Sequence, residues 1–231
     1  MAADNILLLP GMMCDERQWQ PQLASFEQAV FHADTTTTDN FRDMATMTLA
    51  NAPDRFAIAG LSMGGILAFE IWRQAPERVT HMALLDTNPH AEVPERKALR
   101  PKQIETALAG GLRKLAIESL KPLYLATAHR DDEELLGTIL DMALDLGPDV
   151  FRSQSFALRD RIDSVPTLET IDCPTLVMCG DEDTLCPVAY HELMAEMIPN
   201  ARLRVISNCG HLSSLEQPAE VTAELQHLFS Q

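Results

Sequence analysis

The stretch AIAGLSMGGILAFEIW, from Ala57 to Trp72, decides the fold of this chain, because it joins a short apolar strand to a helix through one serine. Its first part reads as a buried parallel strand, and the residues after Gly64 form a broad apolar helical face. A serine in so tight a turn projects its hydroxyl beyond the strand, which requires very small neighbours. Gly60 and Gly64 meet that need, so Ser62 is a candidate nucleophile; the simpler alternative is that Ser62 only caps the helix.

Short apolar runs of the same kind recur along the chain, at Ile6–Leu9, Ala29–His32, Phe56–Ala59, Met82–Leu85, Thr175–Cys179 and Leu203–Ile206. They alternate with helical patterns, which predicts an α/β fold: a mostly parallel, six-stranded, doubly wound sheet with helices on both faces. In such a sheet the functional loops gather beyond the carboxyl ends of the strands.

One interval breaks this alternation. Between Asp86 and Thr175 no convincing strand occurs, and a structureless loop of that length would be implausible. Helical patterns fill it instead, at Pro94–Leu99, Lys102–Ala109, Leu112–Leu120, Asp132–Leu146 and Pro148–Ile162. We therefore expect an α/β core of residues 1–87 and 166–231 with a helical cap inserted at 88–165.

Charge and cysteine content exclude several classes of partner. The 34 acidic and 18 basic side chains give a formal net charge of −16, which repels phosphate backbones and anionic membranes, so neither nucleic acid nor a membrane is expected as partner. The five cysteines form no CxxC pair and no zinc-finger spacing, which indicates reduced thiols and no metal site. With no signal-peptide pattern and no membrane-spanning run, a cytoplasmic location is expected; the oligomeric state has no signal in the sequence.

Three other strand ends carry chemical groups: PGMMCDERQW after the first strand, GDEDTLCP after the fifth and SNCGHLSSLEQP after the sixth. The first offers a turn that can aim a backbone N–H, the second offers acids and the third offers His211. A serine becomes a good nucleophile when an imidazole takes its proton and a carboxylate orients that imidazole. Serine, acid and histidine at one sheet edge therefore predict nucleophilic catalysis.

These motifs resemble the α/β-hydrolase superfamily nearly from end to end, through the PG of LLLPGM, the elbow GLSMGG, the spacing of Gly180, Asp183 and Pro187, and CGHLSSLEQP. The resemblance implies Ser62 as nucleophile, Asp183 as acid and His211 as base, with the amides of Met12 and Met63 forming the oxyanion hole. Asp181, two residues away, and Asp86, at a strand end from which some members draw their acid, remain alternatives to Asp183.

The sequence departs from the family pattern at two places. Pro10 stands where many members carry histidine, which leaves the amide of Met12 unaffected. Met1 precedes the first parallel strand too closely for the two antiparallel edge strands of the family, so six strands are expected instead of eight.

The resemblance implies a serine hydrolase that needs no cofactor and cleaves a small carboxylic ester through an acyl-enzyme on Ser62. Thioester hydrolysis, carbon–carbon bond hydrolysis and perhydrolysis use nearly the same residues, so they remain alternatives. From another class, a ligand-sensing protein that kept the fold without turnover is a further alternative.

The residues nearest the expected nucleophile are mostly apolar, and we expect Met13 and Cys14 to line the substrate site. No lysine or arginine lies beside Ser62, Asp183 or His211 in sequence, which favours neutral short-to-medium acyl esters over anionic ones. The alternative anchors for an anionic substrate are Arg17, Arg130, Arg152 and Arg159.

Overall fold

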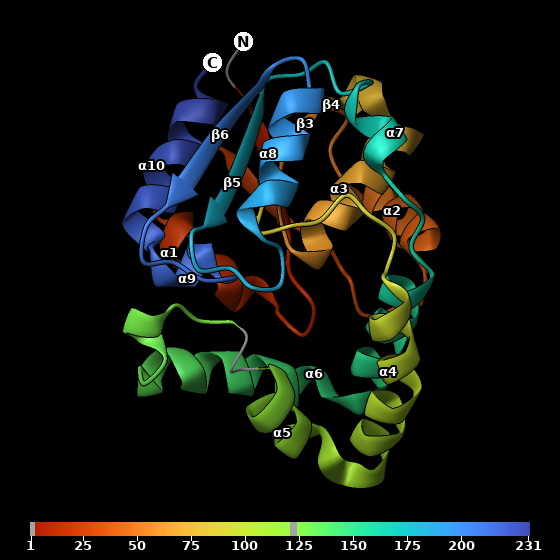
Figure 1. Cartoon of the computed structure of the whole chain (residues 1–231). Coiled ribbons are helices and arrows are strands. Elements are labelled where there is room, and N and C mark those ends of the chain that lie inside the picture. The colour runs from red at the N-terminus through yellow and green to blue at the C-terminus, as the bar shows by residue number, and fades with distance from the viewer. Residues whose placement is uncertain (1–2, 121–123) are drawn as a thin grey trace.

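A single parallel sheet organises the protein, whose computed structural model describes residues 3–120 and 124–231 (Figure 1). The six strands pair in the order β2-β1-β3-β4-β5-β6, and every pair is parallel. Their bounds are β1 Asn5–Leu9, β2 Ala29–His32, β3 Phe56–Leu61, β4 Val79–Leu85, β5 Thr175–Gly180 and β6 Ala201–Ile206. The predicted six-stranded, doubly wound α/β fold is confirmed, with each predicted strand found within a few residues of its expected bounds.

Helices cover both faces of this sheet, because alternate residues of each buried strand point to opposite sides. Leu7 and Leu9 of β1 pack in one apolar cluster with α2, α3 and α8, whereas Ile6 and Leu8 pack in a second cluster with α10. The helices of the first face are α2 Phe41–Asn51, α3 Met63–Gln74 and α8 Val188–Met197; those of the second are η1 Glu16–Trp19, α1 Gln20–Leu23 and α10 Pro218–Phe229. The short η2 Pro76–Arg78, α7 Val165–Leu168 and α9 Ser213–Glu216 complete the core.

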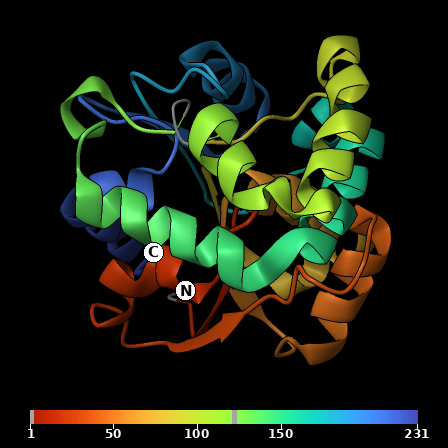
Figure 2. The same cartoon turned by 90° about the horizontal axis from the view of Figure 1, so that it is seen from below.

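The interval between β4 and β5 is the predicted helical insertion. It comprises α4 Pro94–Thr106, η3 Ala107–Gly111, α5 Leu112–Leu115, η4 Ala116–Leu120, η6 Thr127–His129 and α6 Glu133–Asp160. In Figures 1 and 2 these helices lie across the end of the molecule toward which β5 and β6 point. The division into core and cap at residues 88 and 165 stays a prediction.

Two details of the insertion differ from the expected segments. The helices expected on either side of Pro101 form one continuous α4, with Pro101 inside it. The last two expected segments share α6, in which Gly147 has a non-helical backbone (φ 80°, ψ 176°) and marks the boundary placed there from the sequence.

Helix α3 crosses strand β1 with almost no space between the two backbones. A Cβ atom on Gly64 would lie 2.1 Å from the carbonyl oxygen of Leu9, and one on Gly60 would lie 2.5 Å from the carbonyl oxygen of Gly64. Backbone atoms cannot move aside as a flexible side chain can. Glycine is therefore required at both positions by contact, as the sequence predicted for the turn around Ser62.

Gly64→Ala should lower the free energy of unfolding by about 2–3 kcal/mol, as overpacking of a tight contact does. Gly137→Ala is the matched control, because Gly137 lies in α6 with no atom within 4 Å of its added Cβ, and alanine there should add about 0.5–1 kcal/mol of stability. Urea unfolding of both variants measures the difference. Equal midpoints for the two variants would contradict the contact at Gly64.

Candidate active site

Ser62 occupies a strained turn between β3 and α3. Its backbone has φ 55° and ψ −113°, a conformation that L-residues rarely adopt. Two bonds hold it there: the Ser62 N–H donates to the carbonyl oxygen of Leu85 (2.8 Å), and the Thr87 hydroxyl donates to the carbonyl oxygen of Ser62 (2.7 Å). Within the described residues the Ser62 hydroxyl makes no capping bond to α3, so the capping alternative does not describe this serine.

The structure brings Ser62, His211 and Asp183 into one hydrogen-bonded row. His211 Nε2 lies 2.9 Å from Ser62 Oγ, and His211 Nδ1 lies 2.8 Å from Asp183 Oδ2. A carboxylate only accepts hydrogen bonds, so Nδ1 carries the ring proton and Nε2 is left to accept from the serine hydroxyl. The backbone N–H groups of Leu185 and Cys186 donate to the other Asp183 oxygen at 2.8 and 2.9 Å and fix its position.

The two alternative acids lie elsewhere. Asp181 is exposed, and its side chain accepts a long bond from the Cys209 N–H (3.4 Å) and no other within the described residues. Asp86 is fully buried, and its two oxygens accept from the backbone N–H groups of Gly180 (3.2 Å) and Ser213 (3.0 Å). Asp86 thus joins the acid-bearing strand end to the loop that follows His211, without a hydrogen bond to the imidazole among the described contacts.

Burial and charge act on these groups in opposite directions. Burial favours neutral His211, but attraction to Asp183, the hydrogen bond between them and the charge of Asp86 together raise the pKa of His211 above its usual value. Burial, followed by repulsion from Asp183, raises the pKa of Asp86 to about 8. By contrast, burial lowers the pKa of His191 to about 4, and its Nε2 accepts from the Thr87 N–H (3.0 Å).

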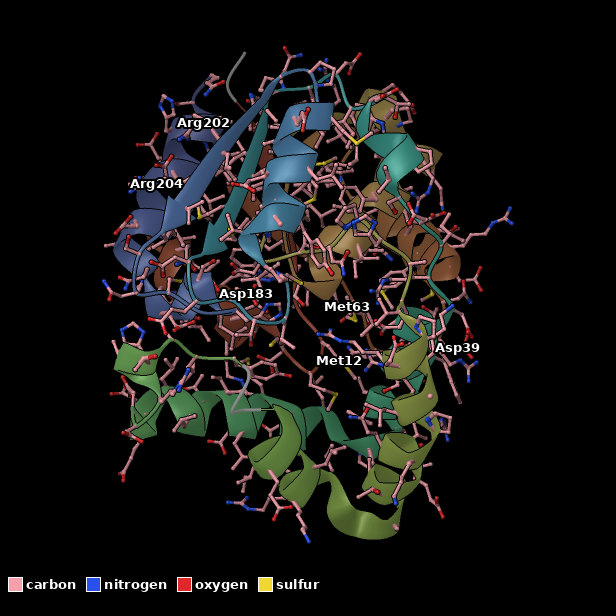
Figure 3. All side chains as sticks on the ribbon, viewed as in Figure 1. Met12, Asp39, Met63, Asp183, Arg202 and Arg204 are labelled. Atoms are coloured by element: carbon pink, nitrogen blue, oxygen red, sulfur yellow. The ribbon has the colours of Figure 1, made fainter. Side chains whose placement is uncertain are left out.

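In the loop after β1, one backbone N–H without a hydrogen bond lies between two N–H groups that are hydrogen-bonded. The Gly11 N–H donates to the side chain of Gln18 and the Met13 N–H to that of Gln154, each at 2.8 Å. The N–H of Met12 between them has no hydrogen-bond partner in the described part of the chain, nor has that of Met63, the first residue of α3. Figure 3 shows both methionines at the sheet edge that faces the insertion, as it does Asp183.

A cavity of about 200 Å³ opens onto Ser62 and His211. Its other walls come from Met12, Tyr124, Leu158 and Leu185 and, on α4, from Arg96, Leu99, Arg100 and Gln103. The arginines that the sequence suggested as anchors, Arg17, Arg130, Arg152 and Arg159, are not in this lining.

Met13 and Cys14 are not in the lining either, contrary to expectation. Met13 is buried in an apolar cluster with Phe151 and Ile104 of the insertion. Cys14 borders a different cavity of about 510 Å³ beside Arg17, and burial raises its thiol pKa to about 12. The left-handed backbone at Met13 (φ 57°) turns the chain immediately after Met12, so neighbours in sequence do not share one wall.

Glu216 connects the histidine loop to the insertion, a role that the sequence did not reveal. One carboxylate oxygen accepts from the N–H groups of Gly210 (3.0 Å) and Leu212 (3.3 Å), on either side of His211. The other accepts from the Ala126 N–H (2.8 Å) and contacts His129 Nδ1 (3.1 Å). No local pattern marks such a residue, because its partners are backbone groups from distant segments.

One group of metal-type ligands occurs among the residues described: Asp183, Cys186 and His211, whose ligand atoms lie within 4.8 Å of one another. Both ring nitrogens of His211 already bond to Asp183 and Ser62. Burial and then Asp183 raise the pKa of the Cys186 thiol well above its usual value, which disfavours the thiolate that binds metals. The group therefore fits a proton-transfer site better than a metal site.

Residues 9–218 match the alpha/beta hydrolase fold family, and the chain belongs to it. It is 25% identical over 202 residues to a pimeloyl-[acyl-carrier protein] methyl ester esterase of Nitrosomonas europaea, covering 79% of this chain and 74% of that protein. It is 22% identical over 252 residues to the biotin biosynthesis bifunctional protein BioHC of Cellvibrio japonicus, covering 99% of this chain and 48% of that protein, so the chain spans about half of that relative.

Among solved structures, a thermophilic esterase from Thermogutta terrifontis with malate bound superposes with a TM-score of 0.86 at 27% identity, covering 98% of this chain and 89% of that one. Two of these three relatives are named as esterases, and the chain is an enzyme of the alpha/beta hydrolase class. None of the helices in the described residues is both long and apolar enough to cross a bilayer. The cytoplasmic location stays a prediction.

The imidazole of His211 should titrate above the ordinary histidine pKa of about 6.5. In Asp183→Asn the attraction is removed while burial remains, so the pKa of His211 should fall below that of the parent. Ring-proton NMR as a function of pH measures the pKa of His211 in the parent and in the variant. The same spectra report His191, whose pKa of about 4 shows how far burial lowers the pKa of an imidazole. The same His211 pKa in parent and variant would show that Asp183 does not raise this pKa.

Proposed function

We propose that the protein is a cofactor-independent serine hydrolase that cleaves a small carboxylic ester through an acyl-enzyme on Ser62. The observation that carries this proposal is the continuous row from Ser62 Oγ through His211 to Asp183, which opens onto a cavity of about 200 Å³. The unbonded N–H groups of Met12 and Met63 support it, because an ester needs donors for the negative oxygen of its tetrahedral intermediate.

In the first half-reaction, Ser62 Oγ attacks the ester carbonyl carbon while its proton passes to His211 Nε2. The carbonyl oxygen becomes negative and is held by the amides of Met12 and Met63, and the second of these also stands at the positive end of α3. The carbon–oxygen bond to the alcohol then breaks, and the proton on Nε2 passes to the departing oxygen. The acyl group is left as an ester of Ser62.

In the second half-reaction, water attacks the acyl-enzyme and gives one proton to His211 Nε2. The bond to Ser62 Oγ breaks, the proton returns to that oxygen, and the carboxylic acid leaves. Asp183 keeps the proton of His211 on Nδ1 and stabilises the imidazolium in both halves. Since His211 must be neutral to accept a proton, activity should fall at acid pH, with a midpoint raised above the ordinary histidine pKa.

Ester hydrolysis is favoured over the other reactions of the fold by the relatives, two of which are named as esterases. Turnover is favoured over ligand sensing by the backbone of Ser62, whose strained φ of 55° serves to present its hydroxyl to His211. In this proposal residues 88–165 act as a cap over the site, and α4 supplies one wall of the cavity.

Ser62→Ala should reduce kcat/KM for short acyl esters by about 10⁶-fold, because the nucleophile is removed. A fluorophosphonate should label the parent on the peptide that contains Ser62 and leave the variant unlabelled, as mass spectrometry will show. Ser207→Ala, at an exposed serine, is the control and should keep full activity. Retention of more than a few per cent of activity in Ser62→Ala would mean that another group attacks the ester.

Asp183→Asn should lower kcat by about 10⁴-fold, since the imidazole loses the carboxylate that sets its tautomer. Asp181→Asn is a matched control two residues away. Because the Asp181 side chain is exposed, this substitution should lower kcat by no more than a few-fold. Steady-state kinetics on the same ester compare the two. A larger loss in Asp181→Asn would transfer the role of acid to that residue.

A further inference from the structure

One face of helix α4 borders the cavity that contains Ser62. Arg96, Leu99, Arg100 and Gln103 follow one another at the spacing of a single helical stripe, and all four line the cavity with Ser62 and His211. Three of the four carry hydrogen-bond donors at the end of long side chains. The wall opposite the expected nucleophile is therefore cationic and polar, not the apolar surface expected from Met13 and Cys14.

The charges on this wall are only partly compensated. Arg100 Nη2 pairs with Glu92 Oε2 at 2.8 Å, but Arg161 Nη2 also pairs with Glu92, at 3.2 Å to Oε1. Two guanidinium groups thus share one buried carboxylate, which leaves one positive charge in excess. The excess is notable in a chain whose formal net charge is −16.

Arg96 has no compensating partner at all within the described residues, where it forms neither an ion pair nor a side-chain hydrogen bond. It is half-buried in the cavity wall, and its charge is close enough to His211 to oppose protonation of the imidazole. A guanidinium presents a planar fork of donors that matches a carboxylate. A cation held unpaired at the mouth of a reaction cavity is suited to bind an anion of the substrate.

We propose that Arg96, assisted by Gln103, binds a carboxylate on the acyl part of the substrate, so that the preferred substrates are monoesters of short dicarboxylic acids. This inference rests on the proposed function of Ser62. The acyl part remains in the cavity after the alcohol leaves, so an anchor on it acts in both half-reactions. Ser62 and Arg96 line the same cavity of about 200 Å³, which favours a short acyl chain between the ester and the carboxylate.

The experiment compares kcat/KM for monomethyl glutarate and methyl pentanoate, which have the same acyl chain length but differ in the terminal carboxylate. The parent should prefer the glutarate ester, and in Arg96→Gln the ratio of the two kcat/KM values should fall by about 10- to 100-fold, as for loss of a charge-assisted bond. Arg96→Lys should retain part of the ratio, because it keeps the charge without the fork.

Arg113→Gln is the matched control for long-range charge. It changes the net charge by the same amount, lies exposed on α5 outside the cavity lining, and should leave the ratio unchanged. Added salt should weaken the parent's preference without reversing it, because the half-buried pair is only partly screened.

Binding of glutarate to the Ser62→Ala variant, followed by calorimetry, tests the same site without turnover. Glutarate should bind this variant and bind at least tenfold more weakly once Arg96→Gln is added. Hydrolysis of methyl pentanoate at the same or a higher rate than monomethyl glutarate would overturn the carboxylate site and leave the proposed function intact. Absence of hydrolysis and of Ser62 labelling would overturn the proposed function instead. In that case the effect of Arg96→Gln on glutarate binding would still test whether Arg96 binds a carboxylate.

Discussion

The contact between helix α3 and strand β1 at Gly64 is the constraint on which the rest of the structure depends. With only 2.1 Å available for a Cβ atom, the helix starts directly against the end of the sheet. Ser62 is consequently forced into its left-handed backbone, and the N–H of Met63 remains outside the helical bonding pattern. A looser contact would relax the turn, and with it the 2.9 Å approach of the serine hydroxyl to His211.

Around this turn, the site is assembled from buried carboxylates that differ in what they bind. Asp183 bonds to the imidazole, Asp86 to the two loops that carry Asp183 and His211, and Glu216 to the histidine loop and the insertion. Each is satisfied mainly by backbone N–H groups, so each fixes the path of the chain around it. These bonds to the main chain hold the three carboxyl groups at defined positions around Ser62 and His211.

The sheet was predictable because buried parallel strands read as apolar runs, and the gathering of a serine, acids and a histidine was predictable because parallel strand ends meet at one edge. The choice of Asp183 over Asp181 and Asp86 came from the resemblance to the family. The cavity walls were not predictable, because no local pattern shows which stripe of an inserted helix faces the core. Arg96 thus escaped notice, while Met13 was assigned to the wall from adjacency to Met12. Adjacency fails where the backbone turns left-handed, as it does at Met13.

The hydrogen bond from the Met13 N–H to Gln154 connects the loop after β1 to α6, a helix of the insertion. Gln154 also donates to Thr35 at 3.2 Å, so a single side chain joins three segments. A swing of α6 away from the sheet would break both bonds and release the loop that carries the Met12 amide. In the proposed mechanism, a ligand that entered by such a swing would find the Met12 amide out of position, so opening of the site and stabilisation of the oxyanion would alternate.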